Sequence, residues 1–154
     1  MSNSADKRRR RALVPVERCP MAQAAILLGD RWMLLILREA FYGVVRYDDM
    51  IDDLGISRSV LTDRLARLVE AGVLERRAYR EPSARTRDAY VLTDSGRQLA
   101  PVFVALTEWG EVNALRRRAP VVTLDRQSGA QVRCRLVDED GEPVPIERLV
   151  LKKR

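Results

Sequence analysis

Residues 56–72 show the apolar and polar periodicity of an amphipathic helix. Three leucines recur at helical spacing and are predicted to face the protein interior: Leu61, Leu65 and Leu68. Ser57 supplies an oxygen that can cap the start of the helix, and Gly72 provides a stop at its end. The outward side is small, polar and basic, a composition that suits a helix inserted into a groove of DNA.

The segments before this helix are also predicted to be helical. Pro20 favours a helix start and apolar residues continue to position 28, while Asp30 can cap a second helix over 31–42 with an apolar centre. Residues 44–46 are predicted to be extended. Residues 48–54 form a brief acidic helix that ends before Gly55. A short helix, a glycine turn and an amphipathic helix together form the pattern of a helix-turn-helix.

Two predicted strands follow, over residues 73–80 and 85–92, and a turn-rich tip at 81–84 joins them. This hairpin is rich in arginine and comes directly after the 56–72 helix. The order is typical of a wing, whose arginines contact phosphates or the minor groove beside a helix in the major groove.

A long helix is predicted from Thr93 or Asp94 to about Arg118, with a bend near Pro101. Its apolar stripe exceeds what one small domain needs to cover itself, which favours a partner helix from an identical chain. The alternative is packing against the chain's own tail. The predicted dimerisation residues are Leu99, Phe103, Leu106, Trp109 and Val112.

The two ends of the chain differ from its middle. Residues 1–14 form a basic arm that is either a solvated tail or a phosphate-contacting segment. Residues 119–154 contain short alternating runs separated by turns, which predict a small β appendage. The predicted fold class is therefore α+β: a mainly helical winged helix-turn-helix domain over 15–118, with a two- or three-stranded wing, dimerisation helices and this appendage.

Charge is unevenly distributed along the chain, whose formal net charge is +6. Residues 20–55 hold three Arg and six Asp or Glu, whereas residues 56–90 hold eight Arg and five Asp or Glu. The positive charge therefore gathers on the helix and hairpin, which favours a polyanionic partner. The chain has no histidine and two cysteines, so we expect no enzyme activity, no metal site and no cofactor. Without a long apolar run, we expect no membrane association and cytoplasmic residence.

Within the 56–72 helix, individual roles can be assigned. Arg58 can reach a guanine edge, and Arg64 is predicted to point toward a neighbouring helix or a flank. Asp63 can accept from a cytosine amine or pair with Arg67. The alternative is an ordinary helix with a solvated charged face. The predicted DNA-binding residues are Ser57, Arg58, Ser59, Thr62, Asp63, Arg67, Arg80, Arg85 and Arg87.

Several collinear segments resemble the HxlR family of winged helix-turn-helix regulators, relatives of the MarR-type repressors. They are C-P-M at 19–21, L-L-G-D-R-W-M-L-L-I-L at 27–37, R-Y-D-D-M at 46–50, G-I-S-R-S-V-L-T-D-R-L-A-R-L-V-E-A-G-V-L at 55–74, Y-V-L-T-D-S-G-R-Q-L at 90–99 and E-W-G at 108–110. The resemblance implies a homodimeric transcription factor that binds operators with two symmetric winged helices. Ala89 departs from the acidic residue usual in the wings of that family.

Cys19 is a possible redox sensor, because it lies beside Arg18 at a predicted helix start and the resemblance includes relatives that sense oxidants there. The alternative is an inert thiol that packs at the helix start. An unidentified small-molecule effector could bind near Tyr42, Tyr47, Trp32 and Trp109, although core packing is the better interpretation for both tryptophans.

The favoured function is a sequence-specific regulator of transcription, expected to be a repressor, that binds double-stranded DNA as a homodimer on an inverted repeat. The alternatives are a redox- or electrophile-sensing regulator acting through Cys19 and a winged-helix module that binds protein or nucleic acid without sequence preference.

Overall fold

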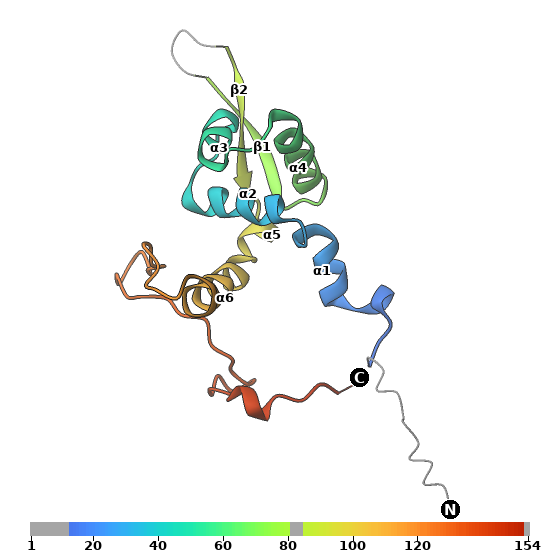
Figure 1. Cartoon of the computed structure of the whole chain (residues 1–154), viewed down its shortest axis with the longest axis vertical. Coiled ribbons are helices and arrows are strands. Elements are labelled where there is room, and N and C mark those ends of the chain that lie inside the picture. The colour runs from blue at the N-terminus through green and yellow to red at the C-terminus, as the bar shows by residue number, and fades with distance from the viewer. Residues whose placement is uncertain (1–12, 81–84, 153–154) are drawn as a thin grey trace, which may run out of the picture. The chain divides into compact units, whose positions relative to one another are not determined.

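The computed structural model describes residues 13–80 and 85–152 (Figure 1). These residues fall into two compact units, one over Leu27–Arg135 and the other combining the described parts of 1–26 and 136–154. The main elements are α1 (Pro20–Leu28), α2 (Arg31–Tyr42), α3 (Tyr47–Leu54), α4 (Arg58–Glu70), β1 (Leu74–Tyr79), β2 (Arg87–Leu92), α5 (Asp94–Arg97) and α6 (Ala100–Gly110). Three single turns complete them: η1 (Val16–Arg18), η2 (Glu111–Leu115) and η3 (Ile146–Arg148).

The helix boundaries follow from local chemistry. The Asp30 side chain accepts from the backbone N–H groups of Trp32 and Met33 at the start of α2. Gly43 ends α2 and Gly55 ends α3, both with positive φ, at 84° and 60°. These are left-handed conformations that glycine adopts without steric cost. The predicted helices over 20–28, 31–42 and 48–54 are therefore confirmed to within one residue at their ends.

The core is built around α2, whose Met33, Ile36 and Leu37 are wholly buried. Met50 of α3 and Leu61, Leu65 and Leu68 of α4 pack against them. Figure 1 shows α3 and α4 flanking the hairpin, α3 beside β2 and α4 beside β1. The helix-turn-helix and the hairpin thus share one hydrophobic core.

The hairpin pairs β1 and β2 antiparallel, in a register that runs from Leu74 opposite Leu92 to Tyr79 opposite Arg87. The predicted extended segment at 44–46 adds a short third pairing. Arg46 bridges Ala89, and the Tyr90 N–H donates to the Val45 carbonyl at 2.7 Å. The tip at 81–84 lies outside the described residues.

The single long helix predicted over 94–118 is wrong. Thr93 caps the short α5, which ends at Arg97, and α6 begins separately at Ala100 with Pro101 in its first turn. Proline lacks a backbone N–H, so it fits a first turn and does not continue a helix from the preceding one. After Gly110 the chain forms the π-turn η2, and this helical segment ends at Arg116, whose φ is 53°.

The small strands predicted over 119–154 are also not formed. The described part of this tail has two isolated bridges, Leu124 with Gln131 and Val137 with Pro143, and the turn η3. The predicted turns are present, with positive φ at Gly129 and Gly141. Most of the tail is exposed, so no layer covers its short hairpins, and two-stranded pairings without such a layer are marginal in water.

No single described helix is long and apolar enough to cross a membrane; α1 and α2 pass that test only when the bent pair is taken together.

Among the described residues, Glu39 of α2 is the charged side chain that is buried in the core, with 2% of its surface exposed. Burial raises its pKa above the ordinary 4.5, the Arg38 guanidinium opposes that shift, and the nearby Asp53 carboxylate reinforces it. A carboxyl with a raised folded pKa contributes stability that is present at low pH and is lost as the pH rises through that pKa.

We therefore expect the Glu39→Gln variant to be more stable than the wild type at pH 7. This difference should disappear below about pH 4, where Glu39 is protonated in both the folded and the unfolded protein. Urea unfolding at the two pH values measures the difference. A variant that is less stable than the wild type by the same amount at both would contradict the burial argument.

Candidate nucleic-acid interface

Helix α4 presents its polar residues outward because its leucines are held in the core. Ser57 caps the helix by accepting from the Val60 N–H at 3.4 Å. Beside this cap the side chains of Arg58, Ser59, Thr62 and Asp63 are exposed, while Arg67 is half-buried. The helix predicted over 56–72 is thus confirmed as Arg58–Glu70, and the predicted contact residues share its outward face.

Tyr47, the first residue of α3, supports this face from behind. Its hydroxyl lies 2.9 Å from the Arg58 carbonyl, to which it donates, and 2.9 Å from the Thr62 hydroxyl oxygen. The Arg58 guanidinium also lies 5.8 Å from the centre of the Tyr47 ring, within the range of a cation–π contact. The first turn of α4 is therefore fixed to α3 by polar contacts as well as by the core.

Asp48 joins the helix to the wing. Its Oδ1 accepts from Nη1 of Arg58 at 3.2 Å, and its Oδ2 accepts from Nη1 of Arg87 on β2 at 3.1 Å. All three side chains are at least 46% exposed. Around them lies a depression of about 490 Å³, lined by α3, the start of α4 and the hairpin, including Arg85. Three predicted DNA-binding arginines, Arg58, Arg85 and Arg87, thus lie at one site.

Arg64 is directed away from this site. It donates to Asp30 through Nε at 3.1 Å and Nη2 at 2.8 Å, and it also pairs with Asp63. The hydrogen bonds from Arg64 lower the pKa of Asp30 below its ordinary value. The prediction that Arg64 points toward a neighbouring helix is confirmed, because Asp30 is the cap of α2. Asp63 is engaged by Arg64, a pairing that the sequence did not predict.

The arginines on either side of the 81–84 tip are exposed. Arg80 follows β1 and Arg85 precedes β2. Two further contacts stiffen the hairpin, with Arg46 over the Tyr79 ring at 4.9 Å and Arg76 over the Tyr90 ring at 6.0 Å. The strands therefore hold their arginines beside the exposed face of α4.

Sequence reasoning did not identify Tyr47 and Asp48 as parts of this site. Asp48 begins the predicted acidic helix over 48–54 and Tyr47 directly precedes it, and their role depends on contacts with residues 10 to 39 positions away. The available signal was an aromatic and an acidic residue at the start of a short helix. That signal does not say which arginines fold back onto it.

The predicted dimerisation stripe divides into two parts. Leu99 and Phe103 pack against the chain's own core, and the Phe103 ring lies 4.7 Å from that of Phe41. Leu106, Trp109 and Val112 remain 47%, 63% and 72% exposed. The first pair thus anchors α6 to α2, and the other three form an apolar surface.

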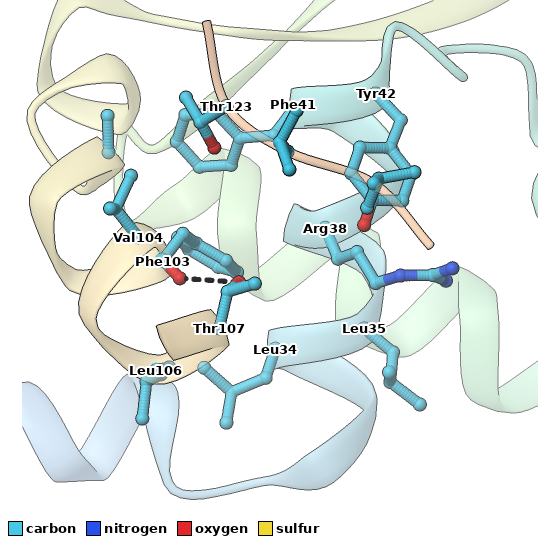
Figure 2. Close-up of a pocket in the computed structure, with 13 residues that line it drawn as sticks. Leu34, Leu35, Arg38, Phe41, Tyr42, Phe103, Val104, Leu106, Thr107 and Thr123 are labelled. Atoms are coloured by element: carbon cyan, nitrogen blue, oxygen red, sulfur yellow. Dashed lines mark hydrogen bonds between the residues drawn. The ribbon is translucent and has the colours of Figure 1, made fainter. Parts of the chain in front are cut away.

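A pocket of about 540 Å³ lies between α2, α6 and residues 121–123 of the tail (Figure 2). Phe41, Phe103 and Leu34 give it an apolar lining, and Arg38 lies at its edge. The Glu108 carboxylate lies 3.6 Å from Arg133 and 3.5 Å from Arg135, which ties the tail to α6. Of the four aromatic residues considered for an effector site, Tyr42 alone lines this pocket.

Cys19 precedes α1 and is half-buried with a free thiol, as is Cys134 in the tail. Among the described residues no group of three or more His, Cys, Asp and Glu could hold a metal ion.

Comparisons with known proteins agree with this geometry. The family model described as HxlR-like helix-turn-helix matches residues 27–118. An uncharacterized HTH-type transcriptional regulator of Mycobacterium tuberculosis is 42% identical over 104 residues, and the match spans 68% of this chain and 65% of that relative. The crystal structure of PA1607, a candidate transcription factor, is 34% identical with a TM-score of 0.74 and covers 89% of this chain and 96% of that one. The redox regulator HypR in its oxidized form is 27% identical, with a TM-score of 0.55 over 62% of this chain and 97% of that one.

Proposed function

The chain belongs to the HxlR-like helix-turn-helix family of transcriptional regulators, and from this premise we propose that it recognises a specific operator and represses transcription. The observation that carries the proposal is the adjacency of the exposed polar face of α4 and the arginines of the wing, linked at Asp48. A helix in the major groove with basic side chains beside it combines base readout with phosphate contacts.

Within this proposal the residues have different tasks. Arg58 lies at the start of α4, where a recognition helix contacts base edges, and its fork fits the two acceptors of guanine. Ser59 and Thr62 are short polar groups on the same face. Arg80, Arg85 and Arg87 contact backbone phosphates or the minor groove. Arg64 is excluded from base readout because Asp30 and Asp63 engage it.

We expect Arg58→Ala to reduce discrimination between bases by about 1–3 kcal/mol. Arg85→Ala should instead lower the affinity for all DNA sequences by the same factor and reduce the salt dependence of binding. Duplexes selected by the wild-type chain from a random pool are compared with scrambled duplexes at several salt concentrations. Arg126→Ala, an exposed arginine of the tail, is the matched control. Equal wild-type affinity for selected and scrambled duplexes would refute sequence-specific recognition.

We also propose that two copies pair through α6. Leu106, Trp109 and Val112 form an exposed apolar surface on one short helical segment, and such surfaces commonly mark an interface. An inverted repeat requires the two α4 helices of such a two-fold pair to reach half-sites about 34 Å apart.

Trp109→Glu should shift the chain from dimer to monomer, because it places a charge in the centre of that surface. Sedimentation at several concentrations measures the mass, and circular dichroism confirms that the variant is folded, as expected for a side chain that is 63% exposed. A variant that sediments like the wild type would contradict pairing through α6.

The pocket between α2 and α6 is the proposed site of an effector. Its volume of about 540 Å³ lies within the range of small-molecule sites, and its apolar lining suits a compact hydrophobic ligand. Cys19 is the alternative signal site, which the likeness to the redox regulator HypR favours. In that case oxidation of a half-buried thiol at the start of α1 would change DNA affinity.

One comparison separates these signals. If Cys19 is the sensor, hydrogen peroxide should release DNA from the wild type and leave Cys19→Ser bound. If the pocket is the sensor, Phe103→Ala should change the thermal shift caused by hydrophobic ligands, and Cys19→Ser should not. DNA release in the peroxide arm is read by fluorescence anisotropy. Unchanged binding of the wild type in peroxide would contradict the redox alternative.

A further inference from the structure

We propose that Asp48 is a positioning residue that sets how strictly the chain discriminates between DNA sequences. It acts by holding Arg58 of α4 and Arg87 of β2 in one fixed arrangement. The inference rests on the proposed function, because it assigns to Asp48 a part in the same recognition site.

The geometry leaves both arginines available to DNA. Each is bound to Asp48 through a single nitrogen, Nη1, at 3.2 Å for Arg58 and 3.1 Å for Arg87. A guanidinium carries five N–H donors in a rigid fork, so anchoring one nitrogen orients the fork and leaves its other edge for a base or a phosphate. Both side chains are well exposed, at 71% for Arg58 and 59% for Arg87.

Tyr47 restricts the same arginine from a second direction. Its hydroxyl holds the backbone carbonyl of Arg58, and its ring lies 5.8 Å from the guanidinium. Arg58 is thus constrained at its main chain by Tyr47 and at its tip by Asp48. A long side chain that is already ordered loses less conformational entropy when it binds its base.

The negative charge of Asp48 lowers the affinity of the chain for DNA of any sequence. A carboxylate beside a DNA-contacting surface repels phosphate, so it weakens binding to every sequence alike. Its positioning effect helps only where Arg58 meets the correct base. The repulsion lowers the affinity for all DNA and leaves the ratio between the correct operator and other DNA unchanged. The positioning effect alone raises that ratio, and this makes Asp48 a determinant of specificity.

Asp48→Asn therefore should lower the ratio of affinities for selected and scrambled duplexes at least about fivefold, the lower end of what a base-reading arginine contributes. Asp49→Asn is the matched control, because it makes the same charge change in the same first turn of α3, away from the ion pairs given for Asp48. The control should change the affinities for both duplexes by the same factor and leave their ratio intact.

A second variant separates position from charge. Asp48→Glu keeps the charge and displaces the carboxylate by one methylene, so the ratio should fall in this variant too. In an Arg58→Ala background, Asp48→Asn should cause no further loss of preference at the bases that Arg58 reads. If Asp48 had a purely structural role, its variants would instead have lower thermal stability, and their affinities for both duplexes would fall by the same factor.

The outcomes distinguish this inference from the proposed function. A wild type that prefers its selected duplex, with the ratio unchanged in both Asp48→Asn and Asp48→Glu, would overturn the inference and leave the proposed function standing. A wild type without any preference would refute the proposed function itself.

Discussion

The burial of one leucine face against α2 determines the rest of the arrangement. Leu61, Leu65 and Leu68 of α4 are at most 1% exposed, so the rotation of α4 about its axis is fixed. Truncating such a side chain to alanine typically costs about 2–5 kcal/mol, a large part of the stability of a domain this size. The polar face of α4 points outward because the leucines on its opposite face are buried in the core.

The core fixes the orientation of α4, and ion pairs then fix the orientation of individual arginine side chains. Asp30 caps α2 and also binds Arg64 of α4, while Asp48 binds Arg58 of α4 and Arg87 of the wing. Surface ion pairs of this kind contribute little stability. Their contribution is geometric, because each carboxylate selects one orientation for a side chain that has many. Two carboxylates that precede α4 in the sequence, Asp30 and Asp48, thus orient arginines of α4 and of the wing.

The sequence predicted the elements whose signals are local. Caps and glycine turns located α2 and α3, and leucine spacing located α4 and its buried face. It failed where several weak signals competed. The apolar stripe after residue 94 suggested one helix, yet a new helix begins at Ala100 with Pro101 in its first turn. The alternating tail suggested strands, which lack a layer to cover them. The role of Asp48 depended on contacts 10 and 39 residues away, and no periodicity reveals those.

Helix α2 contacts both the core that holds α4 and the pocket against α6. Its Met33, Ile36 and Leu37 face the core shared with α4, and its Leu34 and Phe41 line the pocket against α6. A helix moves as a rigid body over this length, since its backbone groups are hydrogen-bonded to one another. Helix α2 contacts both α4, through the shared core, and α6, beside the pocket, and Asp30 at its start also binds Arg64 of α4.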